Sequence, residues 1–453
     1  MQNYFLKLEF FGGILTDLKT QEVWELNLDT AFYMFVYKYL KNKESVNIVL
    51  KEVLKKELLD ISYEVFDFCN EYSCNYTLLD LQAEHSNDLV LVVKCVKAIY
   101  DACIIQDYFS FPNEVTIYPT TNCQLNCNFC FISDCAKGFE NKLTLPDWKN
   151  IIKECVVNGT NSFSILGGEP FLYRDILGLL QEIDKNSIRA TITTNGIYMS
   201  DDVFHFITNS EHLTPVYSIQ ALTEKNRDLM GISPKESISN LKKFIDVGKK
   251  CRINSVLLDQ TFEEICEIID FCVTNEIKRY SIGYYMETHN KIRCAEKNTL
   301  SNAKDWQLKI NEYLEEKDYA NKIAVRIEGC MLYSAYHEEF NENIIKTEYD
   351  RLSYGCECGN TKLEIMPNGD VFACIAFNGT QLKDNVQSYS GIKDLWNNSP
   401  MMSDFRKLKN MQVQKECLRC NLAIFCKGVC PYRKHKRTGS IFLGRDDACE
   451  VIL

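Results

Sequence analysis

The sequence predicts an α/β protein centred on a β/α repeat, with a smaller mixed module before the repeat and a cysteine-rich region after it. Strand-like and helix-like runs alternate from about residue 113 to 287. Three closely spaced cysteines follow the first strand of this repeat, and eight more lie near the C-terminus. Because each β/α unit is about 30 residues long, we expect a parallel sheet with right-handed crossovers, forming a partial or a full barrel.

Composition restricts the class of protein. The chain has 453 residues, which suits two or three domains, and its net charge of -11 argues against nonspecific nucleic-acid binding. No apolar run approaches the length of about 20 residues that spans a bilayer. The 22 cysteines occur without a recognisable export signal, so we expect reduced thiols that serve metals or redox chemistry. These features predict a cytoplasmic metalloprotein with no membrane or nucleic-acid partner.

Residues 1–80 read as a small module of strands followed by helices, which is a winged-helix-like order. A helical linker follows over residues 81–112. A scaffold or dimerisation module is the alternative, and DNA binding is disfavoured because run 62–68 is acidic and contains no Lys or Arg. The expected strands are 4–10, 14–17 and 22–26, and the expected helical runs are 30–40, 45–58 and 62–71.

The β/α repeat supplies six strands and five intervening helices, and function belongs at the carboxyl ends of such strands. The expected strands are 115–118, 162–166, 190–193, 215–219, 253–258 and 279–284. The expected helices are 145–157, 176–184, 201–208, 238–248 and 262–275.

Cys123, Cys127 and Cys130 follow the first strand with C-x3-C-x2-C spacing. Three thiolates on one loop can hold three corners of a cubane iron–sulfur cluster and leave the fourth iron open. An open coordination position is what distinguishes catalytic from structural metal sites. On spacing alone, a zinc site completed by a distant residue and three unrelated thiols remain alternatives.

The second strand ends in the sequence Leu-Gly-Gly-Glu-Pro, residues 166–170. Gly167 and Gly168 let the backbone approach a ligand closely, Glu169 can accept hydrogen bonds from an amino group, and Pro170 fixes the exit of the turn. Together with the cysteine loop on the first strand, this motif resembles the radical S-adenosylmethionine (SAM) superfamily.

The resemblance implies a partial (β/α)6 TIM-type barrel over residues 113–290 and a 4Fe–4S cluster whose open iron binds the amino and carboxylate groups of SAM. It also implies a reducing partner such as flavodoxin or ferredoxin. Several alternative acid or base residues remain, so no general base is assigned. The positions matching the family's SAM contacts are Phe129, Gly167, Gly168, Glu169, Pro170, Thr194, Asn195, Ser218 and Arg227.

The C-terminal cysteines form a second pattern, in which Cys356 and Cys358 precede a hairpin signal, Pro-Asn-Gly-Asp, and Cys374. The pattern resembles the SPASM extension of peptide-modifying radical SAM enzymes and implies two auxiliary 4Fe–4S clusters, three in all; a zinc ribbon is the alternative. We expect a connecting region over 291–350 and the SPASM domain over 351–453. The implied outer ligands are Cys417, Cys420, Cys426 and Cys449, and the inner ones are Cys374, Cys430 and Cys356, Cys358 or both.

If only one of Cys356 and Cys358 binds, the inner cluster keeps an open iron that a substrate thiolate can occupy. Cys294 and Cys330 are spare ligand candidates, and Cys135 has no assigned role. Other thiols fall in helical patterns and are expected to be small buried hydrophobes. These are Cys69, Cys95, Cys155, Cys266 and Cys272.

The combined resemblances imply a maturase of ribosomally synthesised peptides whose N-terminal module is a recognition element for the leader of the precursor peptide. The expected product is a thioether between a peptide cysteine and a carbon of another residue. Carbon–carbon or carbon–oxygen crosslinking uses the same first step. An anaerobic sulfatase-type, formylglycine-forming maturase and a non-catalytic iron–sulfur protein are the remaining alternatives.

Overall fold

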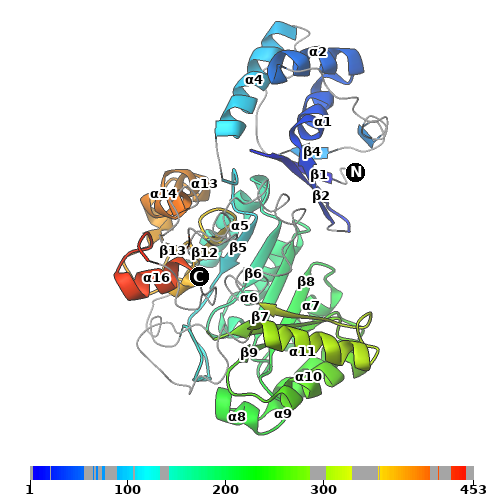
Figure 1. Cartoon of the computed structure of the whole chain (residues 1–453), viewed down its shortest axis with the longest axis vertical. Coiled ribbons are helices and arrows are strands. Elements are labelled where there is room, and N and C mark those ends of the chain that lie inside the picture. The colour runs from blue at the N-terminus through cyan, green and yellow to red at the C-terminus, as the bar shows by residue number, and fades with distance from the viewer. Residues whose placement is uncertain are drawn as a thin grey trace.

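The computed structural model describes residues 4–20, 22–55, 65, 68–69, 74–76, 89–105, 108–132, 142–285, 303–328, 356, 358–408, 417 and 430–444. Figure 1 shows a mixed α/β molecule with an N-terminal module, a central sheet covered by helices, and a C-terminal helical region beside the first barrel strand. Among the described helices, none is both long and apolar enough to cross a membrane.

The N-terminal module contains a four-stranded sheet in the order β3-β2-β1-β4. Strands β1, β2 and β3 are antiparallel, and β4 pairs with β1 in parallel. Asn27 caps α1 by accepting a 2.9 Å hydrogen bond from the Thr30 amide, as an N-cap residue should. The expected third helix, 62–71, lies mostly outside the described residues. The elements are β1 (Tyr4–Glu9), β2 (Gly12–Asp17), β3 (Val23–Asn27), α1 (Leu28–Leu40), α2 (Lys43–Leu54), β4 (Cys74–Tyr76) and α4 (Leu89–Ile105).

The six expected barrel strands are present and pair in parallel in chain order, which confirms the partial TIM-type barrel. They are β5 (Glu114–Ile117), β6 (Ser162–Ile165), β7 (Arg189–Thr194), β8 (Leu213–Ser218), β9 (Arg252–Leu257) and β10 (Arg279–Tyr284). The intervening helices are α5 (Leu145–Val157), α6 (Ile176–Asp184), α7 (Asp201–Asn209), α8 (Lys225–Met230), α9 (Pro234–Asp246) and α10 (Phe262–Thr274).

The sheet continues beyond these six strands at both ends. Helix α11 (Ala303–Glu316) leads to β11 (Ala324–Glu328), which pairs in parallel with β10. At the other end, β12 (Lys362–Ile365) pairs in parallel with β5, so the cysteine-flanked hairpin extends the barrel sheet. Strands β13 (Asp370–Phe372) and β14 (Asp384–Asn385) complete the sheet.

Three helices and three short 3-10 segments make up the remaining elements of the described residues. Helices α13 and α14 lie beside the amino end of the barrel sheet, and α16 follows Cys430 (Figure 1). They are η1 (Pro170–Leu172), η4 (Ile375–Phe377), η5 (Val386–Ser388), α13 (Ile392–Asn398), α14 (Pro400–Lys407) and α16 (Pro431–Thr438).

The N-terminal module is attached to the amino-terminal ends of the barrel strands. Lys7, which is fully buried, donates to the side chain of Asn113 just before β5 at 2.7 Å and forms a 2.9 Å ion pair with Glu9. Arg189, the first residue of β7, donates to the Thr20 carbonyl at 2.7 Å. Radical SAM chemistry is expected at the opposite, carboxyl ends of the strands, so the module and the expected active site lie on opposite sides of the barrel.

The segment 108–113 also joins the C-terminal region to the barrel. The Arg406 guanidinium stacks between the rings of Tyr108 and Trp396, at 3.6 and 4.4 Å from their centroids. Its Nε donates to the carbonyl of Gly359 at 2.8 Å. Gly359 follows Cys358 directly, so this buried arginine holds the loop that carries the paired cysteines.

Candidate active site

The loop that carries Cys123, Cys127 and Cys130 follows β5 at the carboxyl end of the sheet. Cys123 is exposed and the other two thiols are half-buried. The Asn128 amide donates to the Leu229 carbonyl at 3.1 Å, and the Cys130 amide donates to the Cys127 carbonyl at 3.2 Å. These bonds hold the loop against α8, with its three thiols at one end of the barrel.

Burial favours the protonated form of two of these thiols, Cys123 and Cys127. Burial, and secondarily the neighbouring thiols, raise the pKa of Cys127 to about 12. Burial also raises the pKa of Cys123. Iron binding requires thiolates, so a cationic cluster would stabilise the deprotonated form that this pocket disfavours by itself. The donor set, three thiols on one loop, fits a cluster with one iron lacking a protein ligand.

The double-glycine turn packs directly against the start of the cysteine loop. The amide of Gly168 donates to the Thr120 carbonyl at 3.0 Å, and that of Glu169 donates to the Asn122 carbonyl at 2.7 Å. A Cβ atom on Gly168 would lie 2.2 Å from the Asn122 oxygen, and one on Gly167 would lie 2.5 Å from the Thr120 oxygen. Both positions therefore require glycine for close backbone contact, as the motif predicted.

Glu169 has no solvent-exposed surface and accepts three hydrogen bonds from the protein. Oε1 accepts from the Thr194 hydroxyl at 2.8 Å and the Phe171 amide at 3.2 Å, and Oε2 accepts from the Asn195 amide at 2.8 Å. Burial raises its pKa to about 7, although these donors act in the opposite direction. In this structure the carboxylate ties the second strand's turn to the third strand's turn.

Asn195 connects this turn to the cysteines. Its side-chain Nδ2 lies 3.8 Å from the sulfur of Cys123, and its Oδ1 accepts from Gln124 at 3.3 Å. Its own carbonyl accepts from the Ser237 hydroxyl at 2.6 Å. The predicted positions Glu169, Thr194 and Asn195 are thus brought together beside Cys123.

The other predicted SAM contacts make no described hydrogen bond to Cys123 or Asn195. Pro170 is buried at the start of η1, and Phe129 is half-buried within the cysteine loop. Ser218 ends β8 and donates to the Asn254 side chain at 3.0 Å. The Arg227 side chain is 61% exposed and forms an ion pair with Glu224 at 3.2 Å. This geometry does not test whether Arg227 binds the carboxylate of SAM, so that role stays a prediction.

A second group of thiols gathers beside β12 and β13. The Cys358 thiol makes hydrogen bonds with the thiols of Cys356 and Cys374, which, with burial, raise its pKa well above its ordinary value. Cys430 is also buried, and its pKa of about 12 reflects burial first, then the nearby charges of Cys356 and Cys374. The Cys358 thiol therefore contacts both Cys356 and Cys374, so the alternation that would place Cys356 and Cys358 on opposite faces does not separate them.

Most of the predicted outer ligands lie outside the described residues, namely Cys420, Cys426 and Cys449. Cys417 is described and buried. Cys135, Cys294 and Cys330 also lie outside the described part of the chain. Within that part, no three His, Cys, Asp or Glu side chains converge as a single metal ion requires. Of the thiols expected to be buried, Cys155, Cys266 and Cys272 are, and Cys69 and Cys95 are half-buried.

A tyrosine–glutamate pair close to Cys374 was not predicted from the sequence. The Tyr118 hydroxyl donates to Glu364 Oε2 at 2.6 Å, and the amide of Ile375, next to Cys374, donates to Oε1 at 3.1 Å. Burial raises the pKa of both side chains. Tyr118 directly follows β5 and Glu364 lies on β12, so only the parallel pairing of these strands, distant in sequence, brings them together.

Comparison with known proteins agrees with this geometry. The Radical SAM superfamily matches residues 117–272, and an iron–sulfur cluster-binding domain, SPASM, matches residues 356–421. The chain belongs to the radical SAM superfamily and is therefore a radical SAM enzyme with a C-terminal SPASM domain.

Solved structures of Streptococcus suis SuiB cover the whole chain. SuiB bound to precursor peptide SuiA is 32% identical, has a TM-score of 0.82, and covers 100% of this chain and 99% of that one.

Two curated relatives are more distant. The radical SAM cyclopropyl synthase TigE of Paramaledivibacter caminithermalis is 22% identical over 74% of this chain and 71% of that protein. GTP 3',8-cyclase of Clostridium perfringens is 27% identical over 35% of this chain, and the match spans only about half (51%) of the relative.

Proposed function

We propose that this protein is a maturase that crosslinks two side chains of a ribosomally synthesised precursor peptide. The observation that carries the proposal is the full-length likeness to SuiB in complex with a precursor peptide, at 32% identity. The three-thiol loop, the Gly-Gly-Glu turn and the Asn195 contact to Cys123 support the radical-generating part of this function.

The chain's residues would divide this task between its two thiol groups. Cys123, Cys127 and Cys130 would hold the SAM-binding 4Fe–4S cluster, and Asn195 would position Cys123. When bound, the cluster and SAM supply a 5′-deoxyadenosyl radical that removes a hydrogen from the substrate. Gly167 and Gly168 bring backbone groups close to the bound ligand, and the buried Glu169 fixes their position.

Cys356, Cys358, Cys374 and Cys430 would hold the inner auxiliary cluster with four thiolates, and Cys417, Cys420, Cys426 and Cys449 would hold the outer one. Three 4Fe–4S clusters are thus proposed in all. A flavodoxin or ferredoxin would provide the reducing electron. Four thiolates leave no iron for a substrate thiolate, so the inner cluster would accept an electron rather than hold the substrate.

The bond formed is the finer part of the proposal. A thioether between a peptide cysteine and a carbon is the product expected from sequence, and a carbon–carbon or carbon–oxygen crosslink is the second candidate. The proximity of all four inner thiols favours the second candidate. If all four bind, the inner cluster has no open iron to hold the peptide thiolate that would form a thioether. Both products would use the same hydrogen abstraction.

The N-terminal module would capture the leader of the precursor as an added strand. Strand β3 is an edge strand, and two of its apolar side chains, Val23 and Trp24, are 48% and 40% exposed. An exposed apolar edge favours pairing with another strand. The measurement is binding of the full-length protein to a labelled leader, for which Val23→Ser should weaken affinity and the exposed helical control Val157→Ser should not.

The function as a whole is tested by co-expression with any short open reading frame found beside the gene, followed by mass spectrometry of the peptide. Loss of two hydrogens with a crosslinked fragment supports the proposal, and a blocked cysteine identifies a thioether. An unchanged peptide mass, with active SAM cleavage, would contradict it. Conversion of a Cys or Ser to formylglycine would favour the sulfatase-type alternative.

A further inference from the structure

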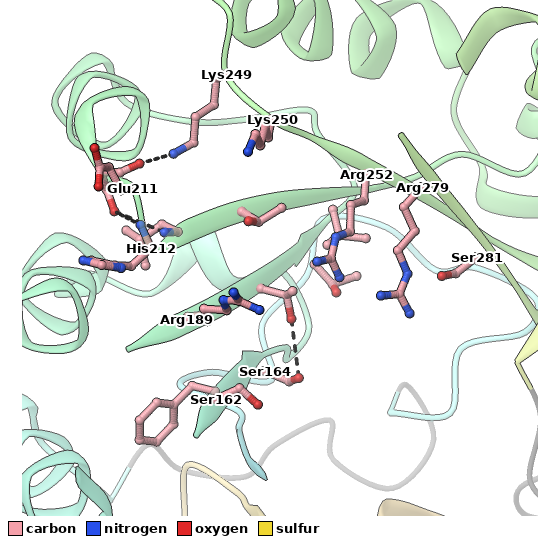
Figure 2. A pocket seen from close by; sticks show the side chains of 18 of the residues that line it. Ser162, Ser164, Arg189, Glu211, His212, Lys249, Lys250, Arg252, Arg279 and Ser281 are labelled. Atoms are coloured by element: carbon pink, nitrogen blue, oxygen red, sulfur yellow. Dashed lines mark hydrogen bonds between the residues drawn. The ribbon is translucent and has the colours of Figure 1, made fainter. Parts of the chain in front are cut away.

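A large polar cavity opens at the amino-terminal ends of the barrel strands, on the side opposite the three-thiol loop. Its volume is about 1250 Å³, and the starts of β6 to β10 line it. Figure 2 shows Arg189, Arg252 and Arg279, the first residues of β7, β9 and β10, around this opening. None of the predicted SAM-site residues lines it.

The cavity wall is strongly basic in a chain whose net charge is -11. Seven Lys or Arg side chains and two Glu side chains line it. One of these cations, Lys362, pairs with Glu114 at 3.5 Å. The excess of cations makes the cavity a region of positive potential that would concentrate an anionic ligand. The basic side chains are Lys19, Arg189, Lys249, Lys250, Arg252, Arg279 and Lys362.

The cavity also extends into the barrel along polar side chains. Thr193, Asn254 and Ser281, which lie further along their strands, line the same space. Asn254 accepts a hydrogen bond from Ser218 at 3.0 Å, and Ser218 is a predicted SAM contact at the end of β8. A strand of six residues such as β8 spans about 20 Å, so the basic opening and the SAM site are about one strand length apart.

The N-terminal module contributes to the rim of this cavity. Lys19 and Thr20, from the turn between β2 and β3, line it, and Arg189 donates to the Thr20 carbonyl at 2.7 Å. The exposed edge strand β3 begins just after this turn. A peptide paired with β3 would therefore reach the basic opening within a few residues.

We propose that this cavity binds an acidic segment of the precursor peptide and directs the adjoining residues into the barrel. The proposal rests on the proposed function, since it takes the substrate to be a peptide. The cavity exceeds the volume of about 300–1000 Å³ typical of small-molecule sites, and its hydroxyl and amide side chains can bond to a peptide backbone. Its cations line a concave wall, which suits an extended chain rather than a docking folded protein.

The test measures binding of fluorescein-labelled hexaglutamate to the reconstituted full-length protein by fluorescence anisotropy, with hexaglutamine as the neutral control. Arg252→Gln/Arg279→Gln should weaken hexaglutamate binding at least tenfold. The matched control, Lys235→Gln/Lys242→Gln, removes two exposed charges on α9 and should change it less than twofold. Peptide-independent SAM cleavage should stay within twofold in both variants, which establishes that the radical site is intact.

A rim variant, Lys19→Gln/Lys250→Gln, keeps the test valid if the arginine variant does not fold, because both lysines are exposed. It should also weaken hexaglutamate binding. Equal binding of the two peptides, or equal effects of the cavity and control variants, would overturn the proposal. Displacement by inorganic tripolyphosphate at far lower concentration than by unlabelled hexaglutamate would also overturn it, in favour of a small polyanion. None of these outcomes depends on whether a precursor is crosslinked.

Discussion

The two thiol groups differ in number, surroundings and burial, and the difference indicates what each can do. Cys123, Cys127 and Cys130 lie on one loop, with Cys123 exposed, beside a glycine turn that allows close approach of a ligand. Cys356 and Cys358 lie on one segment and Cys374 and Cys430 on two others; the first three are half-buried, Cys430 is buried, and all four gather beside β12 and β13. In the arrangement we propose, three thiols would leave a coordination position for SAM, whereas four would complete a cluster that only exchanges electrons.

The largest expected effect is on the three-thiol loop. Cys127→Ala removes one of its three protein ligands, so reductive SAM cleavage should fall by at least about 100-fold and iron content by about four atoms per chain. Anaerobic quantification of 5′-deoxyadenosine and iron analysis measure these changes. Cys155→Ala, at a buried helical thiol, is the control and should retain both. Retained SAM cleavage in Cys127→Ala would contradict the assignment of the SAM-binding cluster to the three-thiol loop.

Substitution in the four-thiol group should separate SAM cleavage from product formation. Cys374→Ala should keep SAM cleavage within about fivefold, since Cys374 does not touch the three-thiol loop, but should reduce crosslinked peptide by at least about tenfold. Parallel assays of 5′-deoxyadenosine and peptide mass give the two rates. Equal loss of both would mean that the two groups do not have separate roles.

A steric substitution tests whether the glycine turn defines the ligand side of the three-thiol loop. In Gly168→Ala the new methyl group would lie 2.2 Å from the Asn122 oxygen, so the turn must shift at a cost of about 1–3 kcal/mol. SAM affinity, measured by anaerobic calorimetry, should fall about tenfold. Gly248→Ala is the control for backbone strain alone, because Gly248 has a φ of +76° but its added methyl would meet nothing within 4 Å, and it should leave SAM affinity unchanged. Unchanged affinity in Gly168→Ala would contradict this role.

The smallest effect concerns the protonation of Glu169. Burial raises its folded pKa from 4.5 to about 7, so between these values the folded state holds a proton that the unfolded state has lost. This contribution to the free energy of unfolding is complete below pH 4.5 and is lost as the pH rises through 7. Its size is about 3 kcal/mol at most. The denaturation midpoint of the protein without SAM should fall between pH 4.5 and about 7, and less so for Glu169→Gln. An equal fall would exclude Glu169 as its cause.

Local patterns predicted the barrel well because each strand and each turn depends on neighbouring residues. The hydrophobic runs located β5 to β10, and the Gly-Gly-Glu-Pro motif located a turn in which Gly168 is required by backbone contact. The pairing of β12 with β5 carries no local signal, since the two strands are far apart in the chain. The Tyr118–Glu364 contact was missed for the same reason.

The buried pair of Lys7 and Glu9 is a second feature that could not be predicted from the sequence. Charged residues on a short strand usually face solvent, and only the docking of the module onto segment 108–113 buries them. The basic cavity did leave a signal, because Arg189, Arg252 and Arg279 each begin a strand. First residues of parallel strands meet at one end of a barrel, so their shared charge could have been predicted.

The most direct test of the central claim is electron paramagnetic resonance of the reduced, reconstituted protein with and without SAM. If only the three-thiol cluster has an open iron, SAM should change one cluster signal in the wild type. Cys127→Ala should retain cluster signals that SAM does not change. A SAM-dependent change in Cys127→Ala would contradict the account, because it would place an open iron in a cluster held by the other cysteines.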